Sequence, residues 1–394
     1  VPLLTTDDQT LVKRRYKAMK KPVAFFLFLS VSLLAFQCQV KPEIAPAESV
    51  RQAVKKDLDS LHAMVKDQLL PLTQPGRDPD SLQQTFLACR AAYKRIEHFA
   101  EYFMPSTSRM LNGPPLNEIE AEENKSFEPG GFQVIEEYLF PETDTTQRAE
   151  LVRETRNLLS HLNRAQIVWD NTDVTDDHVF DAVRLQVVRI LTLGLSGFDT
   201  PGSKSAMPES AVSLAALSDH LKYYQAKQQN PALQAVLKTF AGAMSYLNAN
   251  RDFDSFDRMA FITSFGNPLS AQLLDCQKSL GIENVAVTRV LRADAPTIFE
   301  PGAFDPNAFV AWPEDRPTAA KVKLGKRLFY DPVLSANNQR SCASCHQPEK
   351  AFTDGLAKSE NIHKAGPVAR NTPTILNAAL QGGQFYDLRV ANLE

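Results

Sequence analysis

Cysteine is scarce in this sequence, with five residues among 394, and only two of them lie close together. Cys38, Cys89 and Cys276 are scattered and form no disulfide framework by spacing, although a bridge between Cys89 and Cys276 stays open. The close pair, Cys342 and Cys345, is the single C-x-x-C of the chain. Because a zinc site of this type needs a second pair, structural zinc is not expected.

An excess of charge of one sign is also absent. The net charge is −3, which gives no argument for a nucleic-acid partner. With 43% hydrophobic and 23% charged residues, the chain has the composition of an ordinary globular protein. Its length of 394 residues predicts two or three domains.

The sequence has no apolar run of the roughly 20 residues that a membrane-spanning helix needs. Its most apolar stretch, residues 23–36, follows a group of Lys and Arg residues, as in an export signal. Cys38 comes shortly after this stretch. The arrangement resembles a bacterial lipoprotein signal, which implies that a lipid on Cys38 attaches the protein to a membrane. A simple exported protein and an uncleaved anchor are the alternatives. We therefore interpret residues 1–40 as an extension with an export or lipoprotein-type signal, and expect a bacterial cell envelope or periplasmic location.

Alternating strand patterns are nearly absent, and helical periodicity takes their place. Apolar residues recur at helical spacing in residues 48–70, 79–103, 146–170, 177–196, 210–226, 232–249 and 255–280. These segments predict an all-α fold, with an antiparallel bundle of seven or more helices over residues 45–285. A proline-rich connector is expected over residues 286–317, followed by a separate C-terminal domain over residues 318–394.

The C-terminal domain contains the motif C-x-x-C-H, formed by Cys342, Cys345 and His346. Two thiols on one turn reach the two vinyl groups of a porphyrin, and the imidazole that follows is a good axial ligand for iron. A redox dithiol is the alternative, but the strand-to-helix context typical of one is missing. The motif therefore predicts covalently bound haem c. We expect residues 319–331 to form a short amphipathic helix beside the haem.

The stretch "LGKRLFYDPVLSANNQRSCASCHQPEKAFTDG…RNTPTILNAALQGGQFYDLR" closely resembles the first haem domain of bacterial di-haem cytochrome c peroxidases. The resemblance covers residues 319–394 and implies an enzyme that reduces hydrogen peroxide with electrons from a small cytochrome or cupredoxin. A homodimer stays open. The chain stops at Glu394 before any second C-x-x-C-H, so we interpret it as an incomplete peroxidase. It would hold one haem, with two haems in the full protein, and its catalytic acid–base residue stays unknown.

The resemblance also implies roles for single residues. His346 would be the proximal iron ligand, and His363 the sixth ligand that leaves on activation; an exposed loop histidine is the alternative. Tyr386 in "QFYD" stands where the family has Trp and would relay electrons between haems, unless it is a plain packed aromatic. Asn371 in "RNTPT" matches a calcium position, with a cap at a helix start as the alternative.

The helical region has a resemblance of its own. "EPGGFQVIEEYLF", residues 128–140, resembles the G-x-H-x-x-E signature of imelysin-like envelope proteins, which are linked with iron uptake. Gly131 and Glu136 match, but Gln133 replaces the histidine, and a neutral amide is a poor transition-metal ligand. The resemblance implies an imelysin-like bundle that kept its fold and lost or altered a metal site. For Glu97, His98 and Glu136 the plainer interpretation is a solvated or hydrogen-bonded helix surface.

Two further functions remain as alternatives. One is a non-enzymatic electron carrier or haem sensor, in which His346 and His363 both stay on the iron. The other is an iron- or metal-capture module that works through the helical bundle.

Overall fold

The computed structural model describes residues 44–120, 125–225, 230–287, 289–361, 363, 365–385 and 389–393. The predicted signal over residues 1–40, with Cys38, and the predicted relay Tyr386 lie outside these described residues. Within them, no helix is both long enough and apolar enough to span a membrane.

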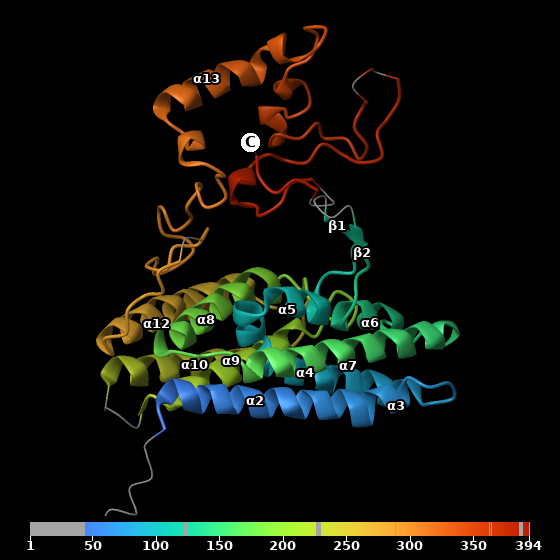
Figure 1. Cartoon of the computed structure of the whole chain (residues 1–394), viewed down its shortest axis with the longest axis vertical. Coiled ribbons are helices and arrows are strands. Elements are labelled where there is room, and N and C mark those ends of the chain that lie inside the picture. Colours follow the sequence, from blue (N-terminus) through green and yellow to red (C-terminus); the bar gives the residue numbers. More distant parts are fainter. Residues whose placement is uncertain are drawn as a thin grey trace, which may run out of the picture. The chain divides into compact units, whose positions relative to one another are not determined.

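Most of the described residues before the connector are helical, which confirms the all-α fold class (Figure 1). One strand pair interrupts it, an antiparallel hairpin of β1 (Glu118–Glu120) and β2 (Lys125–Phe127). The α-helices are α2 (Pro46–Met64), α3 (Leu70–Leu72), α4 (Pro79–Phe103), α5 (Pro105–Asn112), α6 (Phe132–Leu139), α7 (Arg148–Asp170), α8 (Asp176–Arg189), α9 (Ala206–Lys222), α10 (Pro231–Ala249), α11 (Arg258–Phe261) and α12 (Asn267–Ser279). Three π-helical turns continue α2, α8 and α11, namely η1 (Val65–Leu69), η3 (Ile190–Gly194) and η5 (Ile262–Gly266).

Local signals set the ends of the main helices. Asp78 caps α4 by accepting a hydrogen bond from the Ser81 backbone N–H at 2.9 Å. Asn230 does the same for α10, with its side-chain oxygen 2.9 Å from the Ala232 nitrogen. A proline follows each cap, where its missing N–H is harmless. The eight-residue helices α5 and α6 were not predicted, because they are too short to show a clear period.

One hydrophobic core runs through the bundle. α4 packs against α2, α8 and α9, and α10 packs against both α9 and α12. Large aromatic side chains fill the centre, including the fully buried Trp169, Phe86 and Phe180. Cys89 and Cys276 are also buried, and both are free thiols, so the disulfide that the sequence left open is not formed.

The first half of the connector is tied to the bundle. Arg289 pairs with Asp181 of α8 at 2.6 Å, and Arg184, also on α8, donates to the carbonyl oxygen of Ala295 at 2.8 Å. The Ser270 hydroxyl of α12 donates to the carbonyl oxygen of Pro296 at 2.7 Å. Residues 289–296 therefore lie along the bundle surface in contact with α8 and α12.

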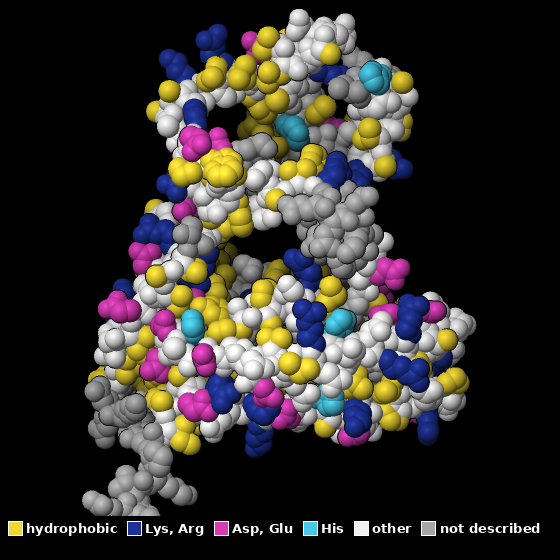
Figure 2. All heavy atoms as spheres, in the orientation of Figure 1, with side chains coloured by type: hydrophobic (Ala, Val, Ile, Leu, Met, Phe, Trp, Pro, Cys, Tyr) yellow, Lys and Arg dark blue, Asp and Glu magenta, His cyan; other side chains and the backbone are white. Residues whose placement is uncertain are grey.

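The C-terminal segment is built differently. Its described residues form one α-helix, α13 (Ala319–Tyr330), and four 3-10 turns, η7 (Pro332–Leu334), η8 (Cys342–Ser344), η9 (Pro348–Lys350) and η10 (Ala378–Leu380). The predicted amphipathic helix is thus present, and it contacts both η7 and η8. No residue of α13 is buried, and Leu324 is 55% exposed. Apolar side chains lie at the surface of this segment (Figure 2).

Candidate haem site

A single 3-10 turn presents the two thiols of the C-x-x-C-H motif. The Ser344 side chain accepts a hydrogen bond from the Ser341 backbone N–H at 3.0 Å, which closes the start of the turn. The carbonyl oxygen of Cys342 accepts from the backbone N–H groups of Cys345 and His346, at 3.2 and 2.9 Å. Both cysteines are free, Cys342 exposed and Cys345 half-buried. Two accessible sulfurs on one turn suit attachment to two neighbouring vinyl groups.

The ring of His346 is oriented by a backbone carbonyl. Its Nδ1 lies 3.1 Å from the carbonyl oxygen of Phe352. Because a carbonyl can only accept, Nδ1 is the donor of this hydrogen bond, and Nε2 is the ring nitrogen that remains to bind a metal. This is the arrangement by which proteins fix the tautomer and direction of a metal-binding histidine.

Two residues with left-handed backbone place that carbonyl. Ala351 has φ = 53° and Phe352 has φ = 62°. For residues other than glycine this conformation costs about 1–3 kcal/mol each, and it persists only where the surroundings enforce it. Here the Phe352 backbone N–H donates to the Gln347 carbonyl at 2.8 Å, and the Thr374 hydroxyl donates to the Ala351 carbonyl at 2.6 Å. The direction of the His346 ring therefore depends on the backbone of residues 347–352.

Three buried polar side chains lie just beyond this turn. The Thr372 hydroxyl is 3.2 Å from Oδ2 of Asp354 and 2.7 Å from the Ser359 hydroxyl. Hydrogen bonding by Ser359, by the Leu356 backbone N–H and by Thr372 lowers the pKa of Asp354. All three side chains are buried in a segment that buries little else. This cluster could not be predicted from the sequence, since nothing in "FTDG" or "RNTPT" alone shows that the two stretches meet.

His363 lies at the tip of a hairpin-like loop. Val368 donates to the Ser359 carbonyl at 2.7 Å across the base, and Asn361 donates to the Gly366 carbonyl at 2.9 Å nearer the tip. The Asn361 side chain accepts from the backbone N–H of His363 at 2.9 Å. The residue itself is exposed. These hydrogen bonds define the base of the loop on either side of His363.

Asn371 is exposed and lies in a stretch without regular secondary structure, and the next helical turn begins at Ala378. The interpretation as a helix-start cap is therefore wrong. The physical reason is Pro373, which disfavours helical backbone at the residue before it. Calcium binding by Asn371 stays a prediction.

The segment that carries the motif has many exposed apolar side chains. Phe329 of α13 packs edge-on against Phe352, with ring centroids 5.9 Å apart. Several larger apolar residues of the segment are more than half exposed, namely Val322, Leu324, Tyr330, Val333, Leu334 and Leu376. Two thiols, an imidazole with a free Nε2 and an apolar surface are the groups that covalent haem needs, so the residues present fit this cofactor.

The second candidate site lies inside the bundle, at the start of α6. Gly131 there has φ = 89°, and a Cβ on it would lie 2.3 Å from the Leu111 carbonyl oxygen, so only glycine fits. Gln133 donates to the carbonyl oxygen of Asn112 at 2.8 Å. One oxygen of Glu136 accepts from the Ser203 backbone N–H at 2.7 Å, and burial raises the pKa of this carboxyl group. Gln133 and Glu136 thus share the inner face of α6 and bind to protein groups.

Glu97, His98 and Glu136 are not a solvated helix surface, and that part of the expectation is wrong. Each is at most 2% exposed. They are hydrogen-bonded instead: Glu97 accepts from Lys94 at 2.6 Å, and His98 Nε2 is 3.0 Å from His220 Nδ1. Burial lowers the pKa of both histidines, that of His220 to about 4. Buried charge was unexpected here because helical periodicity does not reveal which polar residues find partners inside.

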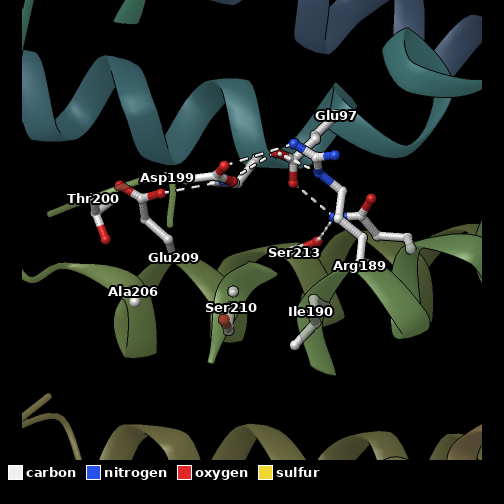
Figure 3. A pocket seen from close by; sticks show the side chains of 12 residues that line it. Glu97, Arg189, Ile190, Asp199, Thr200, Ala206, Glu209, Ser210 and Ser213 are labelled. Carbon is white, nitrogen blue, oxygen red and sulfur yellow. Dashed lines mark hydrogen bonds and ion pairs between the residues drawn. The ribbon is translucent and has the colours of Figure 1, made fainter. Parts of the chain in front are cut away.

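Glu97 belongs to a buried ion cluster between α4, α8 and α9 (Figure 3). Lys94 contacts Glu97 and Asp199, at 2.6 and 2.7 Å, and Arg90 binds both oxygens of Glu209, at 2.7 and 2.9 Å. Burial raises the pKa of Asp199, but the nearby Lys94 and Arg189 outweigh it and lower that pKa to about 2. The pocket at this cluster leaves room for about one water molecule. Among the described residues there is no group of three or more His, Cys, Asp or Glu side chains suited to a metal ion.

Comparison with known proteins covers the two regions separately. The family model for di-haem cytochrome c peroxidase matches residues 319–394. The methylamine utilization protein MauG of Methylorubrum extorquens is 42% identical over 77 residues, 20% of this chain and 22% of that protein. The cytochrome c peroxidase Ccp of Escherichia coli is 42% identical over 84 residues, 21% of this chain and 18% of that protein. For the cytochrome c551 peroxidase of Nitrosomonas europaea the figures are 41% over 78 residues, 19% of this chain and 22% of that protein.

These matches confirm that the C-terminal segment resembles di-haem cytochrome c peroxidases. The chain spans about a fifth of the length of these curated relatives. A crystal structure of an imelysin-like protein from Psychrobacter arcticum aligns over 60% of this chain and 92% of that chain, with 17% identity and a TM-score of 0.45. A likeness this distant supports no inference about function.

Proposed function

We propose that the chain is an exported haem c protein, part of a di-haem cytochrome c peroxidase that reduces hydrogen peroxide with electrons from a small donor protein. The observation that carries the proposal is the orientation of His346. Its Nδ1 is committed to the Phe352 carbonyl at 3.1 Å, next to two accessible thiols on the same turn. The peroxidase-type relatives of residues 319–394 support the same reaction.

Each residue of the site then has a defined task. Cys342 and Cys345 would form the two thioether bonds, and Nε2 of His346 would bind the iron. Haem iron supplies the redox chemistry when bound, by passing electrons to the peroxide oxygens. The Phe352 carbonyl keeps the Nδ1 proton in place, which makes His346 a more basic ligand. His363 would occupy the sixth position at rest and leave it to admit peroxide.

The remaining assignments belong to the same proposal. Tyr386 would relay electrons to a second haem, and Asn371 would contribute to a calcium site. Cys38 would attach the protein to the outer face of a bacterial membrane through lipid. Apolar residues around the motif, such as Leu324 and Leu334, would cover the haem faces and exclude water.

The test is the reaction of the haem-loaded, reduced chain with hydrogen peroxide, followed by stopped-flow absorbance. Oxidation proportional to added peroxide is expected, and His363→Gly should speed it by opening the sixth position. The double variant Cys342→Ala/Cys345→Ala, which should carry no haem c, controls for bulk chemistry. A reduced chain that survives excess peroxide in both the wild type and His363→Gly would favour the electron-carrier or haem-sensor alternative.

A further inference from the structure

One short stretch joins the two parts of the haem segment that carry histidines. Residues 371–375 form no regular secondary structure and contact both the turn that orients His346 and the base of the loop that carries His363. Thr372 is the buried residue of this stretch, 7% exposed, between exposed neighbours. Because most side chains of this segment are exposed, the burial of the Thr372 hydroxyl indicates specific hydrogen-bond partners.

On one side the stretch holds the His346 turn. Thr372 donates to Oδ2 of Asp354 at 3.2 Å, and Thr374 donates to the Ala351 carbonyl at 2.6 Å. Ala351 and Phe352 are the two left-handed residues of this turn. Since the Phe352 carbonyl orients His346, the Thr374 contact bears directly on the direction of the imidazole, and the Thr372 contact holds the chain two residues beyond Phe352.

On the other side the stretch holds the base of the His363 loop. The Thr372 hydroxyl is 2.7 Å from that of Ser359, and the Ser359 backbone N–H donates to the Arg370 carbonyl at 3.0 Å. Ser359 in turn accepts from Val368 at 2.7 Å, which closes the loop. One hydroxyl group therefore contacts both histidine-bearing units.

We propose that Thr372 is a positioning residue that couples the turn holding His346 to the loop carrying His363. The inference rests on the proposed function, in which both histidines bind the iron. If the Thr372 hydroxyl is lost, the base of the loop is freed from the turn, and His363 must be ordered on the iron at a greater entropic cost. The sixth ligand then binds more weakly, although no atom of Thr372 touches it.

The experiment uses the full chain loaded with haem c. Thr372→Val removes the hydroxyl at nearly constant shape, and Thr372→Ser keeps it. We expect Thr372→Val to raise the ratio of high-spin to low-spin ferric haem by roughly fivefold, the effect of about one lost hydrogen bond. Thr372→Ser should match the wild type. Deuterium uptake at residues 359–368 should also rise in Thr372→Val, and it can be measured on haem-free chain as well.

Two further variants distinguish a wrong sixth-ligand assignment for His363 from a wrong coupling role for Thr372. His363→Gly should give high-spin haem; if it leaves the spectrum unchanged, the sixth-ligand assignment is wrong and the coupling falls with it. If His363→Gly acts but Thr372→Val has the wild-type spin ratio and deuterium uptake, the coupling alone is overturned. Should Thr372→Val fail to fold, Ser359→Ala decides, because it removes the loop-side hydroxyl that contacts both Thr372 and Asp354. It is expected to shift both readouts in the same direction, and wild-type values there would overturn the proposal.

Discussion

The helical bundle and the C-terminal segment differ in how far they bury their apolar side chains. In the bundle, residues such as Leu58 and Trp169 are at most 1% exposed and pack against one another. In the C-terminal segment, α13 buries no residue and Leu334 is 71% exposed. The bundle thus carries its core in its own sequence, whereas the segment presents apolar surface that fits a covalently attached porphyrin.

The bundle and the C-terminal segment also differ in the polar groups that they bury. The bundle buries full charges, such as Lys94 and Asp199, and compensates them with ion pairs. The C-terminal segment buries one small hydrogen-bonded cluster around Asp354, which ties two loops together. Buried polar groups therefore support packing in the bundle and set loop positions in the segment.

The largest expected effect tests the ion cluster of the bundle. Lys94→Ala would leave Glu97 and Asp199 buried without their shared cation, and should reduce the free energy of unfolding by about 3–5 kcal/mol. The matched control is Lys204→Ala, because Lys204 pairs with Asp254 at 2.6 Å but is exposed. It should leave stability close to the wild-type value, because solvent screens an exposed ion pair. Urea denaturation followed by circular dichroism compares the two, and equal losses would contradict the account.

A pair of leucine substitutions sharpens the contrast between the regions. Leu58→Ala in the bundle core should lower stability by about 2–5 kcal/mol, since it removes packing and leaves a cavity. Leu324→Ala on α13, studied in haem-free chain, should change it by no more than about 0.5 kcal/mol, as expected for an exposed site. The measurement is thermal unfolding of both variants. A large effect of Leu324→Ala without haem would mean that the segment has a protein core.

Acid should weaken the bundle through His98 and His220. An unfolded histidine takes up a proton below about pH 6.5, whereas burial lowers the pKa of His220 in the fold to about 4. The unfolded chain therefore gains protons first, and stability falls as the pH drops from 6.5 towards 4. His220 alone accounts for about 3 kcal/mol at the low end.

The double variant His98→Gln/His220→Gln should flatten this pH dependence, while the surface variant His62→Gln should leave it unchanged. Denaturant midpoints at several pH values give the comparison. A wild-type slope in the double variant would show that other groups control the acid sensitivity.

Sequence patterns predicted the long elements well. Residues 79–103 were expected as one helix and form α4 with the same bounds, because a 25-residue amphipathic period with a cap leaves little ambiguity. α13 was expected from its amphipathic pattern in the same way. The short helices and the β-hairpin were missed, since segments of three to eight residues show too little of any period.

The haem site was only partly visible in the sequence. The two thiols and the imidazole could be recognised because covalent attachment demands their spacing. The Phe352 carbonyl could not, since it depends on left-handed backbone at residues that rarely adopt it. The contact of Thr372 with Asp354 joins residues 18 positions apart, and no local pattern encodes it.

Covalent haem at Cys342 and Cys345 is the central claim, and intact mass spectrometry tests it most directly. The chain should be produced with a c-type maturation system, extracted with acid–acetone and compared with Cys342→Ala/Cys345→Ala. The account predicts a wild-type mass increased by one haem that survives extraction, and no such increase in the double variant. Haem lost on extraction, or zinc bound in its place, would contradict it.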